Sequence, residues 1–367
     1  MRLLLLDQFS DPGGAQQCLL ELLPAIRERG WQSLTGLPGE GVLFPRIREM
    51  GLETARIECG PYTSGTKSAR DLARFVTGTP KLARQIRALA GDFDADLVYL
   101  NGPRLLPAAA LAGLPCPVVF RCHSYLFQGS VRTLAGWSLR RMNAWVVAAC
   151  RFVADPWSPY IRPERLSILY NGIPGPAALS ARPRPGPPRV GCLGRIAPEK
   201  GQREFLAAAA IIRQALPDCR FVIYGAPLFS GARYAEGVHA AANGLPVEFA
   251  GWVHDVYAAL AELDLILVPS AAHESTARAI LEAFAAGVPV VAFRSGGIPE
   301  ILDHGHGGWL AGSVEEMARV AINFLASSPS ERASAGQAAR EHWRRRFTPE
   351  RYHRELLDRL DEIRRAR

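Results

Sequence analysis

Residues 265–293 read LILVPSAAHESTARAILEAFAAGVPVVAF. The apolar run Leu265–Val268 precedes a helical pattern that starts at about Thr276, and a second apolar run follows at Val288–Phe293. Unbroken aliphatic runs separated by a helix are typical of parallel strands that are buried on both faces. The stretch therefore predicts one strand–helix–strand unit of a parallel α/β sheet.

The same alternation of short apolar runs and longer helical patterns occurs along the whole chain. It runs once to about Asn171 and restarts at Arg189, which predicts two parallel sheets covered by helices. We expect an α/β fold with two Rossmann-like domains whose parallel sheets face a central cleft, and ligands beyond the carboxyl ends of the strands. The other expected strands are Leu3–Leu6, Leu97–Leu100, Val118–Phe120, Trp145–Val147, Ile168–Tyr170, Val190–Leu193, Phe221–Tyr224 and Val247–Phe249.

A proline-rich segment, PGPAALSARPRPGPPR, separates the two halves of the pattern. Proline has no amide hydrogen and fixes its own φ, so this segment is expected to be an extended linker. After the second half, apolar residues from Leu356 to Ile363 recur at helical spacing. The expected divisions are an N-terminal Rossmann-like domain at 1–173, a linker at 174–189, a C-terminal Rossmann-like domain at 190–347 and a helix at 348–367 that packs back on the N-terminal domain.

The composition is that of a globular protein, with 48% hydrophobic residues and a mean hydropathy of +0.02. No apolar run reaches the ~20 residues of a membrane-spanning helix. The opening MRLLLLD has only four consecutive apolar leucines before an acid and no small-residue cleavage site, so we expect a buried strand and a cytoplasmic protein. The seven cysteines contain no CxxC pair, which argues against a disulfide framework and a zinc site.

The net charge of +8 is concentrated in the first half of the chain. Up to Ile173 there are 20 basic and 14 acidic residues. This excess favours an anionic partner there, such as a lipid phosphate, an anionic membrane surface or an acidic acceptor. Nucleic acid is not expected, because no basic run is interleaved with stacking aromatic residues.

Two loops that follow strands have the composition of anion sites. The first, Asp11-Pro12-Gly13-Gly14, precedes a helix expected from Ala15, whose free amides can face an anion. It is not a GxGxxG fingerprint, and a simple turn is the alternative interpretation.

The second such loop, GRIAPEKG, runs from Gly194 to Gly201. Arg195 and Lys200 flank Pro198, which is expected to open a helix, so that both charges can converge on one anion. Only three of the 43 basic residues are lysines, so a lysine here indicates a compact donor rather than a default choice. The alternative is a solvated helix start.

Two carboxylates follow the strand Leu265–Val268. Glu274 is expected in the loop and Glu282 two turns along the helix, so they do not form a side-by-side acid/base pair. They can accept hydrogen bonds from two parts of one long ligand, and sugar hydroxyls are suitable donors. Glu282 lies among apolar residues, where an unpaired carboxylate is costly, although a surface position is the alternative.

His123 follows the strand Val118–Phe120 and is expected to point into the cleft from the first domain. A single histidine at a strand end is commonly structural, which is the alternative interpretation. Its position at a carboxyl end favours a functional role.

These residues together resemble the family-4 glycosyltransferases of the GT-B fold, a group of retaining enzymes. The family's G-R-x4-K-G segment corresponds to Gly194–Gly201, and its E-x7-E signature to Glu274 and Glu282. AGVPVV at 286–291 and GGIPE at 296–300 follow in the family's order, and the tract 301–310 occupies the place of the loop before its last strand.

The resemblance implies roles for these residues toward a UDP- or GDP-type nucleotide diphosphate sugar. Arg195 and Lys200 would hold the diphosphate, and Gly13 and Gly14 would cover it from the other domain. Glu282 would hold the ribose. The further residues implied for the transferred sugar, the base and the backbone contacts are Glu274, His123, Gly194, Gly225, Trp252, Val253, Ser275, Thr276, Ala277 and Arg278.

The implied activity is a retaining, metal-independent transfer to a glycan, lipid-linked or small-molecule acceptor in bacterial glycan or glycolipid synthesis, without a cofactor. After Glu274 many members have Pro-Phe-Gly where this chain has Ser-Thr-Ala, so the sugar is not assigned. The DxD sequences at 92–96 precede a strand at its amino end, and His304 and His306 lie in a glycine-rich turn; neither predicts a metal site.

Other classes share the expected phosphate grip. A nucleotide-sugar epimerase would act without an acceptor, and a non-catalytic protein would bind the sugar nucleotide alone. A phosphorylase usually needs a pyridoxal lysine, and no lysine besides Lys200 occurs in the second domain. Basic residues from Lys67 to Arg87 recur at helical spacing, which predicts either a solvated helix face or peripheral docking at the inner face of the membrane.

Overall fold

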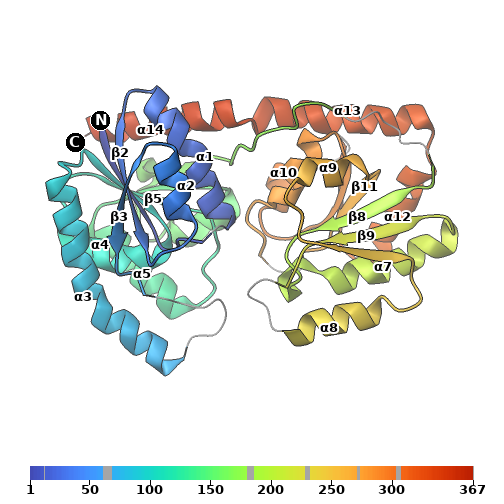
Figure 1. Cartoon of the computed structure of the whole chain (residues 1–367), viewed down its shortest axis with the longest axis horizontal. Helices are drawn as coiled ribbons and strands as arrows, with labels where there is room; N and C mark the ends of the chain where they lie inside the picture. Colours follow the sequence, from blue (N-terminus) through green and yellow to red (C-terminus); the bar gives the residue numbers. More distant parts are fainter. Residues whose placement is uncertain are drawn as a thin grey trace. The chain divides into compact units, whose positions relative to one another are not determined.

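In a computed structural model the chain forms two compact units, one from Met1–Gly172 with Pro349–Arg367 and the other from Ile173–Thr348. The structure describes residues 1–11, 13–60, 68–179, 186–227, 232–270, 273–302 and 307–366. We call the first of the two compact units unit 1 and the second unit 2. Each contains one fully parallel sheet with helices on both faces (Figure 1).

The sheet of unit 1 has the strand order β3-β2-β1-β4-β5-β6-β7. The order reverses between β1 and β4, which places the topological switch point between these two strands. The strands are β1 Arg2–Asp7, β2 Gln32–Pro38, β3 Glu53–Ile57, β4 Leu97–Asn101, β5 Val118–Cys122, β6 Trp145–Ala148 and β7 Leu166–Ile168. The helices are α1 Gly14–Glu28, α2 Leu43–Glu49, α3 Ala69–Asp92, η1 Pro103–Leu105, α4 Leu106–Ala112, α5 Gly129–Arg141, α6 Arg151–Ala154, η2 Asp155–Trp157, η3 Pro163–Arg165 and α14 Pro349–Arg365.

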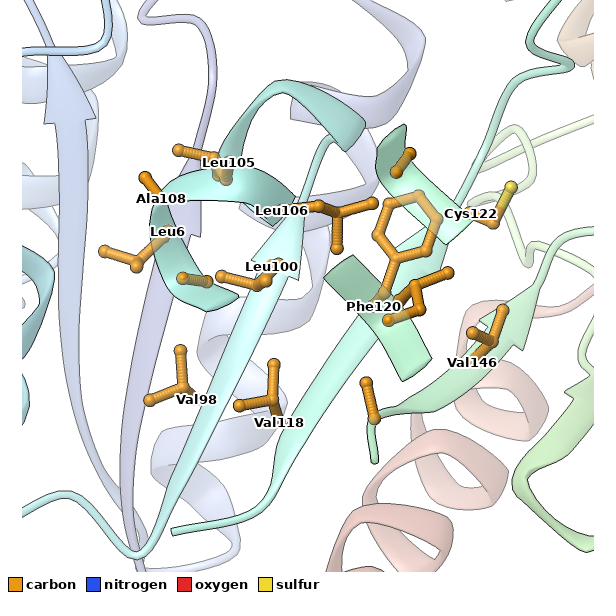
Figure 2. Packing of buried hydrophobic residues seen from close by; sticks show 14 of the residues in the cluster. Leu6, Val98, Leu100, Leu105, Leu106, Ala108, Val118, Phe120, Cys122 and Val146 are labelled. Carbon is orange, nitrogen blue, oxygen red and sulfur yellow. The ribbon is translucent and has the colours of Figure 1, made fainter. Parts of the chain in front are cut away.

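Alternate residues of these strands pack on opposite helical layers. Leu4 and Leu6 of β1 belong to the core under α3, α4 and α5, whereas Leu3 and Leu5 belong to the core with α1, α2 and α14. Figure 2 shows the first core, in which side chains of β1, β4 and β5 lie beside η1 and the start of α4. Burial on both faces explains why the strands are unbroken apolar runs.

The sheet of unit 2 has the order β10-β9-β8-β11-β12-β13, with its switch point between β8 and β11. The strands are β8 Arg189–Leu193, β9 Arg220–Tyr224, β10 Val247–Gly251, β11 Leu265–Val268, β12 Val290–Phe293 and β13 Gly308–Ala311. The helices are η4 Pro198–Lys200, α7 Gln202–Ala215, α8 Ala232–Ala241, α9 Val256–Ala261, α10 Arg278–Ala285, α11 Ile298–Ile301, α12 Val314–Leu325 and α13 Pro329–Arg346. Helices α7, α8 and α12 cover one face, and α10 packs on β11, β12 and α13.

The two-sheet α/β fold is confirmed, but several element predictions were wrong. The strands β2 and β3 were not predicted: β2 contains a glycine and ends in proline, and β3 is a half-exposed edge strand with polar residues. The tract 301–310 was predicted as a loop, although β13 begins at Gly308. The strand expected at Ile168–Tyr170 is Leu166–Ile168, and the helix expected from Thr276 starts at Arg278.

A buried guanidinium ties the end of unit 1 together. Arg121 of β5 donates to the carbonyl oxygens of Val147 and Leu169 and, at 2.6 Å, to Oδ1 of Asn171. The ring of Tyr352 on α14 lies 5.4 Å from the guanidinium carbon. Since backbone carbonyls and an amide bind its terminal nitrogens and an aromatic face lies against it, Arg121 has a structural role just before the loop that contains His123.

Candidate functional site

The loops after β8 and β11 meet across the switch point of unit 2. Lys200 Nζ lies 2.5 Å from Oε2 of Glu274, and these side chains are 25% and 13% exposed. Gly201 adopts φ +72°, and a β-carbon there would lie 2.0 Å from the carbonyl oxygen of Pro269. The backbones therefore approach so closely that only glycine fits, which brings the lysine to the carboxylate.

The loop after β8 is held by a residue that the sequence did not single out. Gln202 is fully buried; its Nε2 donates to the carbonyl of Arg195 at 2.7 Å, and its Oε1 accepts the amide of Ala197 at 3.2 Å. The prediction that Pro198 opens an α-helix was wrong. Pro198 opens the 3-10 turn η4, and α7 starts only at Gln202. Arg195 Nη2 lies 2.9 Å from Glu199 Oε1 in a half-exposed pair.

The nearby ends of β8, β9 and β10 are joined through glycines. The amide of Gly225 donates to Gly251 at 2.7 Å, and a β-carbon on Gly225 would lie 1.9 Å from the carbonyl oxygen of Gly194. Trp252, which follows Gly251, is 54% exposed, and Val253 follows it. Gly225, Trp252 and Val253, the positions expected near the nucleotide base, therefore follow the carboxyl ends of the neighbouring strands β9 and β10.

Glu274 is fixed by its backbone as well as by its ion pair. Its carbonyl oxygen accepts the amide of Gly297 at 2.8 Å, and a β-carbon on Gly296, at φ +55°, would lie 2.0 Å from the same oxygen. His273 has the left-handed φ of +52°, which non-glycine residues adopt rarely. The carboxylate position is therefore determined by contacts with the loop after β12.

Glu282 lies on α10, and its carboxylate is paired with the preceding turn. Arg278 Nε donates to Glu282 Oε1 at 2.8 Å, and the glutamate side chain is 13% exposed. The helix begins after Ala277, whose side chain has no group that can cap it. The partial positive charge of this helix end is directed toward the segment that contains Ser275, Thr276 and Ala277.

In unit 1, polar side chains join the ends of β1, β4 and β5. Asp7 and Asn101 are register partners at the carboxyl ends of β1 and β4, and Asn101 Nδ2 donates to Asp7 Oδ2 at 2.5 Å. His123 Nε2 lies 3.0 Å from Asn101 Oδ1. The switch point of unit 1 therefore contains a continuous hydrogen-bonded chain from Asp7 to His123.

The surroundings shift the pKa values of Asp7 and His123, the two titratable groups of this hydrogen-bonded chain. Burial raises the pKa of Asp7 to about 6, although hydrogen bonds from Asn101, Phe9 and Gln16 lower it. Burial, together with the charge of Arg121, lowers the pKa of His123 well below its ordinary range. The imidazole is therefore neutral at neutral pH.

The glycine pair expected to cover the phosphates lies at the start of α1. Gly13 caps the helix in an extended conformation, and Gly14 is its first residue. Gln16 on the first turn donates to Asp7, which connects this helix start to the polar chain of β1 and β4. The polar residues Asp7, Gln16 and Asn101 were missed as site residues, although two of them end predicted apolar strands.

The DxD sequences at 92–96 and the histidines His304 and His306 were not expected to bind a metal. Asp96 Oδ2 accepts the amide of Arg2 at 2.7 Å, and Asp94 lies 3.9 Å from the guanidinium of Arg2. Among the residues that the structure describes, no cluster of three or more His, Cys, Asp or Glu side chains could hold a metal ion. His304 and His306 lie outside the described residues, as does Lys67.

Comparison with known proteins places both units in one family. A family model described as Glycosyltransferase Family 4 matches residues 12–174, and one described as Glycosyl transferases group 1 matches residues 187–327. A GDP-mannose-dependent alpha-(1-6)-phosphatidylinositol monomannoside mannosyltransferase of Mycolicibacterium smegmatis is 29% identical over 317 residues, 76% of this chain and 80% of the relative. A 2-deoxystreptamine glucosyltransferase of Streptomyces kanamyceticus is 29% identical over 288 residues, 69% and 72% of the two chains.

Solved structures share the fold. Alr3699/HepE of Anabaena, in complex with UDP and glucose, has a TM-score of 0.82 at 24% identity and covers 98% of this chain and 99% of its own. Sucrose-phosphate synthase of Thermosynechococcus elongatus has a TM-score of 0.80 at 18% identity over the full length of both chains. Two parallel Rossmann-like sheets with these structural matches define the GT-B fold. The chain belongs to the family-4 glycosyltransferases.

Within the described parts of the chain, no helix combines the length and the apolar character that crossing a bilayer requires.

Proposed function

We propose that the protein is a retaining, metal-independent glycosyltransferase that moves a sugar from a UDP- or GDP-type nucleotide sugar to an acceptor hydroxyl. The ion pair between Lys200 and Glu274 at the switch point of unit 2 carries this proposal. It brings together a cation suited to a diphosphate and a carboxylate suited to sugar hydroxyls, beside the start of α10. A glycan, lipid-linked or small-molecule acceptor fits the names of the relatives described above.

The same residues support a mechanism without a covalent intermediate. The Glu274 carboxylate lies against Lys200, and the Glu282 carboxylate against Arg278, so each already neutralises a cation. In the proposed step, the bond between the sugar and the diphosphate breaks while the acceptor oxygen attacks the same face. The departing diphosphate oxygen takes the acceptor proton. Arg195, Lys200 and the amides at the start of α10 stabilise the charge that grows on the phosphate oxygens.

The proposed independence from metal follows from the same charge. Arg195 and Lys200 would supply the positive charge that a divalent cation supplies to diphosphates elsewhere. We expect transfer to continue at an unchanged rate in excess EDTA. Activity that disappears with EDTA and returns with Mg²⁺ or Mn²⁺ would overturn this part of the proposal.

Binding and product analysis test the reaction itself. A panel of UDP, GDP, ADP and their sugars should contain one pair that raises the Tm of the full chain, since a ligand of the native state stabilises it. Proton NMR of the product should show the anomeric configuration of the donor. An inverted product contradicts retention, an isomerised donor indicates an epimerase, and binding without turnover in the presence of candidate acceptors indicates a sensor.

We further propose that unit 1 docks on an anionic membrane at its cytoplasmic face in glycolipid synthesis. Leu72 and Val76, one turn apart on α3, are 62% and 61% exposed, and Arg70 and Arg74 of the same helix are exposed. Apolar side chains beside basic ones suit a lipid surface with negative head groups. Liposome flotation should recover more protein with phosphatidylglycerol vesicles than with neutral ones, and Leu72→Ser with Val76→Ser should remove the difference. Equal recovery of the unsubstituted chain would contradict docking.

A further inference from the structure

The polar chain at the switch point of unit 1 has a direction that its end groups determine. It starts at the carboxylate of Asp7, passes through the amide of Asn101 and ends at the imidazole of His123. Each link is a hydrogen bond of 3.0 Å or less. Because an amide has a donor end and an acceptor end, the group at one end of the chain decides what the other end meets.

The amide of Asn101 has one orientation that satisfies its neighbours. Its Nδ2 donates to Asp7 Oδ2 at 2.5 Å and to the carbonyl of Ala15 at 3.3 Å, and both of these atoms are acceptors. Its Oδ1 must therefore be the atom that faces His123, at 3.0 Å from Nε2. A carbonyl oxygen only accepts, so Nε2 has to carry the proton.

The carboxylate of Asp7 is itself held by groups on its other oxygen. Asp7 Oδ1 accepts the backbone amide of Phe9 at 2.9 Å and Nε2 of Gln16 at 2.8 Å. The Phe9 amide cannot rotate independently of the chain. Asp7 thus presents an acceptor on both oxygens, which an ionised carboxylate does and no other side chain of its size does.

We propose that Asp7 is a positioning residue that, through Asn101, fixes His123 as the Nε2–H tautomer and leaves its Nδ1 as a hydrogen-bond acceptor for a substrate hydroxyl group. The inference rests on the proposed function in one respect, namely that His123 lies near the reacting sugar. The opposite tautomer would present a donor at Nδ1. The buried carboxylate therefore determines whether the imidazole can accept a hydroxyl proton, although it does not touch the substrate.

The substitution Asp7→Asn tests this because it changes one acceptor into a donor at constant shape. The fixed Phe9 amide keeps the new carbonyl oxygen, so the new NH2 group faces Asn101. The Asn101 amide must then rotate, and its Nδ2 donates to His123 Nε2. The proton of the imidazole should consequently move to Nδ1.

Long-range ¹H–¹⁵N correlation spectra of the full-length protein at pH 7.5, above the pKa of about 6 of Asp7, report the tautomer directly. Loss of one signal set in His123→Gln assigns the resonances. The unsubstituted chain should show a protonated Nε2, and Asp7→Asn a protonated Nδ1. Gln16→Leu is the matched control: it removes one donor from the same carboxylate but leaves the contact with Asn101, so Nε2 should stay protonated.

Kinetics provides the second measurement. Asp7→Asn should lower kcat by about tenfold to a hundredfold, as the loss of a partner that orients a metal-bound histidine does, with little change in the KM of the nucleotide sugar. A protonated Nδ1 in the unsubstituted chain overturns the proposal without any variant, and so does an unchanged tautomer in folded Asp7→Asn. If the tautomer switches in Asp7→Asn but the unsubstituted protein transfers no sugar, the positioning role is supported and the proposed function is contradicted.

Discussion

The two sheets reach their switch points with opposite chemistry. In unit 2 the loops after β8 and β11 are joined by an ion pair, Lys200 with Glu274, whose members keep some exposure. In unit 1 the ends of β1 and β4 are joined by a buried hydrogen-bonded chain that holds the neutral imidazole of His123. The same topology thus provides a partly exposed ion pair in one unit and a buried carboxylate that is hydrogen-bonded through an amide to a neutral imidazole in the other.

This difference indicates how each site can respond to a ligand. An ion pair in partial contact with water can exchange its partner for a phosphate or a sugar hydroxyl, because no buried charge is left behind. A buried chain of hydrogen bonds cannot rearrange without leaving a polar group unsatisfied, so it preserves geometry. We therefore expect substitutions in unit 2 to weaken binding of the charged diphosphate. Substitutions in unit 1 should change the orientation of His123 and the dependence of stability on pH.

The largest expected effect is that of removing the cation of unit 2. Lys200→Ala should lower kcat/KM for sugar transfer by about thirtyfold to a thousandfold, equivalent to about 2–4 kcal/mol of transition-state stabilisation, close to the range for losing one donor to a developing oxyanion. Arg195→Ala should act similarly. The matched control is Lys81→Ala, since Lys81 also pairs with a carboxylate, Glu58, but both side chains are more than half exposed. Transfer by Lys200→Ala at the unsubstituted rate would show that the ammonium does not contact the diphosphate.

The next effect concerns the buried acid of unit 1. The pKa of Asp7 is about 6 in the folded protein against 3.8 ordinarily, so the folded state binds this proton more tightly. The free energy of unfolding should therefore fall as pH rises from about 4 to about 6, by about 3 kcal/mol from this group. His123, whose pKa is lowered, acts in the opposite direction below its ordinary pKa.

Comparing Asp7→Asn with the unsubstituted chain isolates the carboxyl group, because His123 is present in both proteins. The difference in their free energies of unfolding, measured by urea titration at pH 4 and pH 7, should shift by about 3 kcal/mol in favour of the variant at pH 7. A difference that is the same at both pH values would mean that Asp7 titrates normally.

A smaller effect is expected from the glycine that supports Glu274. Gly296→Ala would place a methyl group 2.0 Å from the carbonyl oxygen of Glu274, at a φ of +55°. Gly244 is the matched control, with φ +80° and no atom within 4 Å of a β-carbon. Both substitutions incur the cost of left-handed backbone, about 1–2 kcal/mol, and only Gly296→Ala must also move backbone. Urea unfolding should show it to be less stable by about 2 kcal/mol more than Gly244→Ala; equal losses would contradict the close approach.

The smallest effect should come from the half-exposed pair of Arg195 with Glu199. Glu199→Gln should change the free energy of unfolding by less than about 1 kcal/mol, since such pairs are screened by water. Donor kcat/KM should change by less than about fivefold if Arg195 reaches the diphosphate on its own. A loss as large as that of Lys200→Ala would mean that Glu199 orients the guanidinium.

The sequence predicted the strands of both sheets where burial on both faces makes them apolar, as at β1 and β4. It did not predict β2 or β3, whose glycine, proline and polar residues carry no apolar pattern. The loop residues Lys200 and Glu274 could be selected because each follows such a strand. Their contact depends on Gly201 and Gly296, where the backbones come together in a way that spacing does not encode.

The hydrogen-bonded chain of unit 1 could not be predicted from the sequence for a related reason. Asp7 and Asn101 are 94 residues apart and become neighbours only through the register of β1 with β4. Each is a single polar residue at the end of a leucine-rich strand, which is a weak signal by itself. Once the strand order is known, two polar side chains on both sides of a switch point become a specific prediction.

We propose that Lys200 of unit 2 holds the donor diphosphate, whereas His123 of unit 1 does not. Isothermal titration of the nucleoside diphosphate that binds the unsubstituted chain tests it most directly, with Lys200→Ala and His123→Gln as the two variants. We expect Lys200→Ala to raise the Kd by about tenfold or more, the loss of one charge-assisted contact, and His123→Gln to leave it within about twofold. An unchanged Kd in Lys200→Ala, or an equal loss in both variants, would contradict the account.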